Sequence, residues 1–496
     1  MNHQTQEAKF NPVFWLILSA LLLPLMISND SLWYDEGFTA RYVLQPDFHA
    51  WWHYLTQAND SQMPLAMFFA WAAAKVLGTQ EWQLRAINVL WGGIAIWGMY
   101  RAGKRLQLPW LPLLLAIQPY FWFYSNEARP YSLQIACGAW LFASFVEFFT
   151  LKGAGESWAW LFSGTATILF FATMLAPLSI VACLIAGGVM AGWYRWKITR
   201  RAVLILLGGA VVNIPMALFY YFFALARGNI GAQIWHVDLK FFGYVIYELT
   251  GMAGLGLPAE KIREIAKTPH LLAAVIQHGA QFILPMVCFL ILLLILALRL
   301  HKRPAKAQAG MYAGIVTVLC ITSFMFIIGG ICIQKAFWAR HFAPIFPFYV
   351  ALLGMGLASV FEARSFSVKL LGGVLVGLLL FSVLNLRFAA QYRKEDNRSA
   401  AQFARDALDE NKTVWWVAGT GIVQYYHLDF AASRPEAKKF LCPGSTAIEG
   451  MPAPDVIIFS NSKPDVYDPL GTIQNFIKQN GYKPTEHLRS FVIWTR

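Results

Sequence analysis

The chain has 496 residues, of which 57% are hydrophobic and only 14% are charged. Because soluble globular proteins carry roughly 25% charged residues, this composition excludes a disordered chain and argues strongly against a soluble enzyme. The mean hydropathy of +0.48 favours a polytopic α-helical membrane protein. The net charge of +13 is concentrated in residues 1–389. Membrane proteins accumulate Lys and Arg in their cytoplasmic loops, so we expect no nucleic-acid partner.

Eleven apolar blocks follow one another along residues 1–389, and most approach the ~20 residues that a spanning helix needs. They cover residues 11–29, 82–100, 109–125, 131–150, 157–174, 176–194, 202–224, 279–298, 310–332, 342–361 and 368–388. A shorter block, 64–78, is typical of a helix at the membrane interface. The sequence therefore predicts about eleven transmembrane helices.

Basic residues lie in alternate short loops and set the orientation. They include Arg101–Arg105, Arg195–Arg201 and Arg299–Lys306, which the excess of Lys and Arg on the inner side places in the cytoplasm with the N-terminus. Loops 30–81 and 225–278 and the tail 390–496 are then extracytoplasmic. The first block has no small-residue cleavage site, so we expect a retained span of a multi-pass protein in the cytoplasmic (inner) membrane.

The tail changes character near Gln391. Three runs at 413–419, 455–460 and 491–494 are typical of strands, and 397–410 and 470–480 are typical of helices. This alternation predicts a small α/β domain. We therefore expect a transmembrane catalytic domain over 1–389 and an extracytoplasmic α/β domain over 390–496.

The first outer loop begins with two adjacent carboxylates, Asp35 and Glu36, and contains a further acid, Asp60. Carboxylates at a membrane interface are costly unless they are solvated, paired or used. A carboxylate there can accept a proton from an incoming hydroxyl or amine, or hold a divalent cation. A solvated loop start is the alternative, and the pattern alone leaves it open.

The other candidate residues are basic and lie on the same outer side. Arg129 offers phosphate a planar fork of donors, and Glu127 can orient it or share a metal ion with the first loop. Lys335, Arg340 and His341 form a second cluster where basic residues are disfavoured, and Arg85 begins the following span. A Glu127–Arg129 ion pair and anchoring of Arg340 to lipid headgroups are the alternatives.

Three of these features together resemble the GT-C glycosyltransferases. They are the acidic pair after the first span, the Met63-Pro64-Leu65 step into an aromatic block, and the Glu-Ala-Arg-Pro-Tyr turn that ends at Tyr131. The chain is most similar to the bacterial protein O-mannosyltransferase and aminoarabinose-transferase family, and Arg340-His341 resembles a later outer loop of that family. The family commonly has Pro-Pro-Leu where this chain has Met63-Pro64-Leu65, and the tail carries no matching signature.

The resemblance implies an inverting glycosyltransferase that moves a sugar from a polyprenyl-phosphate donor to a cell-envelope lipid, glycan or protein. It implies Asp35 as the catalytic base, Glu36 as its acidic neighbour, and Arg129 and Arg340 as ligands of the donor phosphate. Lys335, His341 and Arg85 are further candidates for the phosphate; Glu127, Tyr131 and Asp60 are expected to support the site. If a divalent metal ion takes part, Asp35 and Glu127 are the expected ligands.

A transporter or flippase for lipid-linked sugars is the competing class. Such a protein would place ionisable residues near the middle of the membrane and show broken helices in corresponding halves. The spans here are nearly free of charge and no internal repeat is visible, which favours the enzyme. A non-catalytic envelope scaffold would leave the outer acidic and basic residues without a purpose.

Overall fold

The computed structural model describes residues 11–57, 62–218, 239–258, 261–262, 265, 273, 276–301, 306–333, 337–428, 440–443, 448, 451–461 and 467–496. Two compact units share these residues. Unit 1 contains Met1–Ser28, Thr56–Phe69 and Arg85–Tyr392, and unit 2 contains Asn29–Leu55, Ala70–Leu84 and Arg393–Arg496. The last boundary falls at Tyr392, near the predicted start of the tail, but unit 2 also takes in parts of the first outer loop.

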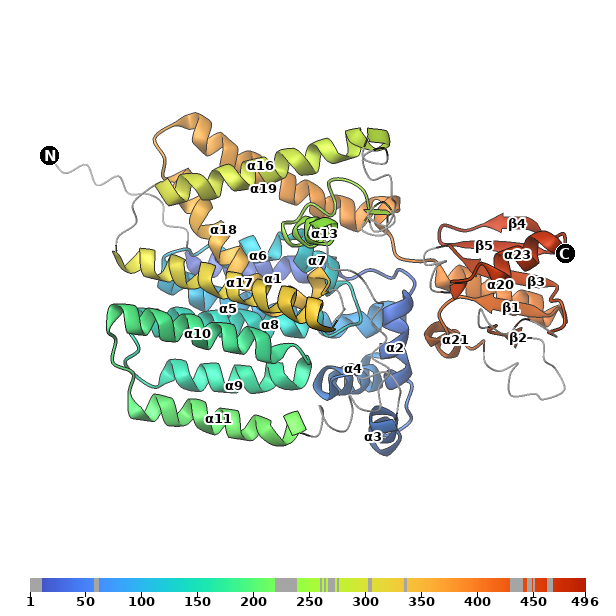
Figure 1. The fold of residues 1–496 in the computed structure, drawn as a ribbon, viewed down its shortest axis with the longest axis horizontal. Helices are drawn as coiled ribbons and strands as arrows, with labels where there is room; N and C mark the ends of the chain where they lie inside the picture. Colours follow the sequence, from blue (N-terminus) through green and yellow to red (C-terminus); the bar gives the residue numbers. More distant parts are fainter. Residues whose placement is uncertain are drawn as a thin grey trace. The chain divides into compact units, whose positions relative to one another are not determined.

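Unit 1 is helical (Figure 1). Its elements are α1 (Pro12–Met26), α6 (Leu111–Ala116), α7 (Pro119–Ser125), α8 (Tyr131–Thr150), α9 (Ser157–Ala172), α10 (Ala176–Tyr194), α11 (Arg200–Leu218), α13 (Leu239–Leu249), α16 (Gly279–His301), α17 (Lys306–Ile333), η2 (Ala339–Ile345), α18 (Phe346–Phe361), α19 (Phe366–Phe388) and η3 (Ala390–Tyr392). Helices α4 (Pro64–Leu77) and α5 (Glu81–Leu106) are divided between the two units.

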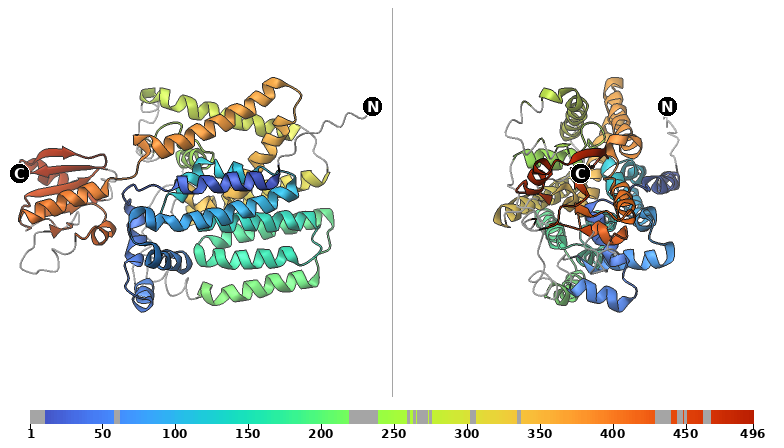
Figure 2. Two further views of the ribbon diagram at one scale, coloured as in Figure 1. Left: turned by 180° about the vertical axis from the view of Figure 1, so that it is seen from behind. Right: turned by 90° about the vertical axis from the view of Figure 1, so that its right-hand side faces the viewer.

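Within the described residues, seven helical stretches are long and apolar enough to cross a membrane. They are α8, α10, α11, α19, most of α16 and α17, and the stretch Ala339–Phe361 that joins η2 to α18. Helices α1, α4 and α9 are apolar but shorter. The chain therefore has the fold of a polytopic membrane protein, with α8, α9 and α11 packed in series (Figures 1 and 2).

One predicted span differs from the structure. The block 109–125 forms two short helices, α6 and α7, instead of one. Each has a proline in its first turn, Pro112 in α6 and Pro119 in α7. Proline has no backbone N–H and favours the first turn of a helix, so Pro119 starts a new helix instead of continuing the old one.

Unit 2 contains a five-stranded sheet with the strand order β2-β1-β3-β5-β4. Strands β1 (Val414–Val417), β2 (Phe440–Leu441) and β3 (Val456–Ser460) are parallel, and β4 (Lys483–His487) and β5 (Phe491–Thr495) join antiparallel. The helices of unit 2 are α2 (Tyr34–Val43), α3 (Phe48–Gln57, which continues just past the boundary at Leu55), α20 (Asn397–Asp409), α21 (Gly421–Tyr425) and α23 (Thr472–Gln479).

Both faces of the sheet are covered, which explains why β1 and β3 are buried along their whole length. Trp415 and Ile457 pack with Ile473 and Ile477 of α23, while α20 packs on β1 and β3 (Figure 2). The predicted α/β tail is therefore confirmed, with its three strands and two helices. The short strand β2 and the exposed strand β4 were not predicted.

Candidate functional site

The acidic pair lies in the first turn of α2, in unit 2. Asp35 is half-buried and Glu36 is fully buried, at 0% exposure. The Glu36 carboxylate accepts a hydrogen bond from the Trp33 backbone N–H at 3.2 Å, which satisfies a donor at the start of the helix. Acidic side chains are also favoured at this end by the helix dipole. The pattern Trp-Tyr-Asp-Glu-Gly therefore forms a helix start, not a solvated loop.

Glu36 is paired with a cation from the tail. Lys394 Nζ lies 3.0 Å from Glu36 Oε1, and the Lys394 side chain is only 11% exposed. Removing either member of a buried ion pair leaves an uncompensated charge out of water, which is costly. Sequence reasoning did not identify Lys394. Its only signal was the charged run that begins at Arg393, directly after the last apolar block.

The same run makes three further contacts within unit 2. Glu395 Oε2 accepts the Tyr34 backbone N–H at 3.3 Å, and Asn397 donates to the Leu32 carbonyl at 2.9 Å. The Arg398 guanidinium bonds Glu81 at 2.8 Å. The segment 394–398 thus bonds the backbone just before Asp35, at Leu32 and Tyr34.

Tyr467 lies near the acidic pair. Its ring packs against that of Tyr34, with 6.0 Å between the ring centroids. Burial raises the pKa of Tyr467 well above its usual value, and the negative charges of Glu395 and Asp35 add to that effect. Tyr467 therefore stays protonated beside a half-buried Asp35 carboxylate. It was also missed from the sequence, because it lies 432 positions further along the chain.

The basic candidates described by the structure belong to unit 1. Arg85 is fully buried, and its Nη1 donates to the Ser28 carbonyl at 3.1 Å. Ser28 also exchanges two hydrogen bonds with the Asn126 side chain, at 2.8 and 2.9 Å. Arg85 and the turn that contains Arg129 therefore meet at the same residue. One turn along α5, Asn88 donates to the carbonyls of Ser125 and Glu127, at 3.0 and 2.6 Å, and fixes that turn.

Three tyrosines line the other side of this turn. The rings of Tyr120 and Tyr124 are 4.5 Å apart, and those of Tyr124 and Tyr131 are 5.0 Å apart. The Tyr120 hydroxyl donates to the Ala339 carbonyl at 2.8 Å. Arg129 precedes Tyr131 by two residues and Arg340 follows Ala339. Both arginines are half-buried, and each is close in the chain to a member or a hydrogen-bond partner of one tyrosine cluster, Tyr120/Tyr124/Tyr131.

The segment η2, which carries Arg340, is held close to α8. A Cβ at Gly138 would lie 2.1 Å from the Pro344 carbonyl oxygen. Only glycine permits that approach between helix and segment. His341 lies in the same segment, and its ring packs edge-on against Phe337 at 5.6 Å. Lys335 and Asp60 lie outside the described residues.

A buried carboxylate that the sequence did not single out joins the cluster. Glu248 of α13 is 4% exposed and accepts hydrogen bonds from Tyr244 at 2.6 Å and Tyr124 at 3.3 Å. The predicted supporting residue Glu127 is also buried, at 2% exposure. Unit 1 therefore carries arginines, buried acids and phenols on neighbouring segments. Such a mixture can bind a phosphate and limit where it sits.

No group of three or more His, Cys, Asp or Glu side chains within the described ranges is arranged to hold a metal ion. Glu147 is a carboxylate within the apolar helix α8. It is paired with Arg101 at 3.0 Å and accepts a hydrogen bond from Ser157. It is thus a paired residue near a helix end. Such pairing is the usual state of an acid in a membrane segment.

Comparisons with known proteins place the fold. No protein-family model matches the sequence, and no curated protein sequence matches it. Among solved structures, apo ArnT from Cupriavidus metallidurans aligns over 97% of both chains, with 13% identity and a TM-score of 0.50. ArnT bound to undecaprenyl phosphate aligns over the same share with 13% identity and a TM-score of 0.43. The apo oligosaccharyltransferase of Archaeoglobus fulgidus aligns over 95% of this chain and 72% of its own, with 12% identity and a TM-score of 0.49. The chain is thus similar in fold to ArnT over nearly its whole length.

Proposed function

We propose that the protein is an integral membrane glycosyltransferase. It moves a sugar from a polyprenyl-phosphate donor to a cell-envelope acceptor on the outer face of the cytoplasmic membrane, with inversion at the sugar carbon. The observation that carries the proposal is the unequal state of the two adjacent acids: Glu36 is buried and ion-paired, whereas Asp35 is half-buried beside it. The fold shared with ArnT and the resemblance of the outer loops support it.

Asp35 is the general base in this proposal. A base must reach the proton of the acceptor, and a half-buried carboxylate can do so where a fully buried one cannot. Glu36 bonds Lys394 and the Trp33 N–H, so it acts as a positioning residue that fixes the first turn of α2. Pairing with Lys394 is therefore what distinguishes the role of Glu36 from that of Asp35.

Arg129 and Arg340 bind the donor phosphate. Both lie next to the tyrosine cluster in the chain, and guanidinium groups form charge-assisted, bidentate hydrogen bonds with phosphate oxygens. Arg85 of α5 bonds Ser28, which also bonds the turn that contains Arg129. His341 follows Arg340 in η2. Glu248 and Glu127 place negative charge near Tyr124 of the cluster. Lys335 and Asp60 remain candidates from the sequence.

The reaction balances without a metal ion or an oxidant. The acceptor oxygen or nitrogen attacks the anomeric carbon of the sugar while Asp35 takes its proton. The bond from that carbon to the phosphate oxygen breaks, and its electron pair leaves with the polyprenyl phosphate. The arginines stabilise the negative charge that develops on this leaving group. Attack from the side opposite the phosphate inverts the configuration.

The test uses the purified full-length protein in detergent, with undecaprenyl-phosphate sugars labelled on the sugar and membrane-envelope fractions as acceptor. Undecaprenyl phosphate is chosen because it is the ligand of one ArnT structure. Transfer of label to an envelope molecule, lost in Asp35→Asn and retained in the exposed-surface control Lys483→Gln, is the expected result. Movement of intact donor across vesicles without transfer would establish the transporter instead.

A further inference from the structure

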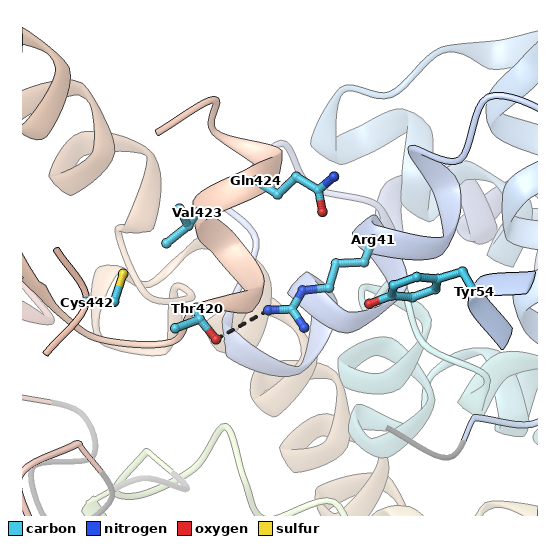
Figure 3. Close-up of a pocket in the computed structure, with 6 residues that line it drawn as sticks. All are labelled: Arg41, Tyr54, Thr420, Val423, Gln424 and Cys442. Carbon is cyan, nitrogen blue, oxygen red and sulfur yellow. Dashed lines mark hydrogen bonds between the residues drawn. The ribbon is translucent and has the colours of Figure 1, made fainter. Parts of the chain in front are cut away.

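Unit 2 contains a pocket that is lined by none of the residues assigned a role in the proposed reaction. Its volume is about 370 Å³, within the range of small-ligand sites. The side chains that line it come from α2, from α3, from α21 and the residue before it, and from the residue that follows β2. They are Arg41, Tyr54, Thr420, Val423, Gln424 and Cys442. Figure 3 shows Arg41 reaching into the pocket, with Tyr54 on one side and Thr420 on the other.

The pocket is preformed, because the helices that line it are in close contact. A Cβ at Gly37 would lie 2.9 Å from the Gly421 carbonyl carbon, so α2 and α21 touch through glycines. That approach brings Arg41, one turn further along α2, to Thr420. Its Nη2 donates to the Thr420 hydroxyl at 3.3 Å (Figure 3).

Among the described residues of unit 2, no carboxylate neutralises the charge of Arg41. Its contacts are the neutral Thr420 hydroxyl and the Phe38 ring, 5.9 Å below the guanidinium. Over the part of the chain that the structure describes, Arg41 forms no ion pair with a carboxylate. A guanidinium has five N–H donors in a planar fork, so one hydroxyl acceptor leaves most of them for a ligand.

The remaining lining suits a sugar. Thr420 and Tyr54 carry hydroxyl groups and Gln424 carries an amide, which both donate and accept hydrogen bonds. Val423 supplies an apolar wall. Convergence of one cation with several two-way hydrogen-bonding groups fits a molecule that is rich in hydroxyls and carries one negative charge.

We propose that this pocket binds an acidic saccharide, one with a phosphate or a carboxylate, as part of the acceptor. Arg41 pairs with the anionic group, and Thr420, Tyr54 and Gln424 bind its hydroxyls. This assignment of the acceptor rests on the proposed transferase function. Binding at the pocket is a separate property and is tested without transfer.

The experiment measures ligand protection of Cys442, an exposed thiol in the pocket wall. The full-length protein in detergent is labelled with a maleimide and each cysteine is followed by mass spectrometry. The probes are glucose 1-phosphate, glucuronate and neutral glucose. Comparison of the two acids distinguishes a ligand with a phosphate from a ligand with a carboxylate. Glucose tests whether the negative charge is needed. Exposed Cys332, at the end of α17 in unit 1, serves as the internal reference.

We expect at least one acidic probe to slow labelling of Cys442 but not of Cys332, and glucose to have no such effect. Arg41→Gln should weaken this protection by roughly tenfold or more, the fold-change that corresponds to a lost charge-assisted hydrogen bond. Arg41→Lys should restore only part of it, because the ammonium lacks the fork. The control Lys483→Gln removes one exposed charge from the same unit and should change nothing.

Equal protection by glucose, or full protection in Arg41→Gln, would overturn the pocket assignment. The outcome is independent of the transfer assay. Protection without any transfer activity would count against the proposed function and leave an acidic-saccharide site. Transfer without protection would leave the transferase and remove this site as its acceptor pocket.

Discussion

Lys394 Nζ lies 3.0 Å from Glu36 Oε1, and both side chains are shielded from water, although 358 positions separate them in the chain. Neither residue can be changed alone without leaving a buried charge. We expect Lys394→Met or Glu36→Gln to destabilise the protein by about 3–5 kcal/mol, the usual cost of breaking a buried pair. Thermal unfolding of the detergent-purified protein measures this change.

The double variant Glu36→Gln/Lys394→Met is the matched control for that pair. Because it removes both charges together, it should be clearly more stable than the less stable single variant. Additive losses in the double variant would mean that the two side chains act independently.

Asp35→Asn should lower turnover by roughly 10²–10⁴-fold, the usual contribution of a general base. The amide keeps the size of the carboxylate but cannot accept the acceptor proton. Binding of undecaprenyl phosphate should be nearly unchanged, since Asp35 acts on the acceptor. Turnover with labelled donor and equilibrium binding are measured on the same preparation. Near-normal turnover would transfer the base assignment to another residue, and Glu36→Gln would then be the next variant to assay.

Arg340→Lys and Arg129→Lys should each weaken binding of undecaprenyl phosphate by about 1.5–3 kcal/mol, the value of a hydrogen bond to a charged group. Lysine keeps the charge but loses the planar fork. Arg105→Lys, an exposed residue at the end of α5, is the control and should bind normally. If Arg340→Lys or Arg129→Lys leaves the affinity for undecaprenyl phosphate unchanged, that arginine does not bind the phosphate. It would then be an ion-pair partner or a lipid anchor.

The acid sensitivity of the α/β domain should depend partly on Asp455. The backbone N–H and hydroxyl of Thr413 bond its carboxylate at 2.7 and 2.8 Å and lower its pKa below the usual 3.8. A lowered folded-state pKa adds stability above the unfolded pKa, and that stability is lost as the pH falls through the folded value. Asp455→Asn should therefore unfold more readily than the parent chain at pH 7. The difference should shrink below about pH 4, as measured by thermal melts across that range; a gap that stays constant would contradict this.

The orientation can be read with reporters. The distribution of Lys and Arg predicts the tail outside the cytoplasm and the loop at Arg364 inside it. Alkaline phosphatase, which is active only outside the cytoplasm, should be active when fused after Arg496 and inactive when fused after Arg364. The reversed pattern would put Asp35 in the cytosol and contradict the proposed reaction on the outer face of the membrane.

Local pattern was enough to predict most helices and the strands of the tail, because hydrophobic periodicity and turn residues act over a few positions. It failed at 109–125, where Pro119 starts a new helix inside a continuous apolar block. A proline at such a point can either kink a helix or begin one, and packing decides between them.

The candidate site was predictable only in part. Asp35, Glu36, Arg129 and Arg340 stood out because charge is rare in this chain, and their catalytic roles stay predictions. Lys394, Tyr467 and Glu248 did not stand out, since each acquires its importance from a partner more than a hundred positions away. Arg41 was missed for a related reason, because its pocket is assembled from four segments that only the folded chain brings together.

The contacts of residues 394–398 with α2 and the residues just before it have a consequence for shortening or recombining the chain. The α/β tail resembles a detachable module when it is viewed by sequence alone. A chain cut after Tyr392 would nevertheless lose the cation of Glu36, the acceptor for the Tyr34 N–H and the Arg398 partner of Glu81. Grafting the tail of a relative would have the same effect unless residues 29–55 and 70–84 travelled with it. The unit that folds together is therefore discontinuous in sequence: it joins residues 29–55 and 70–84 to the tail.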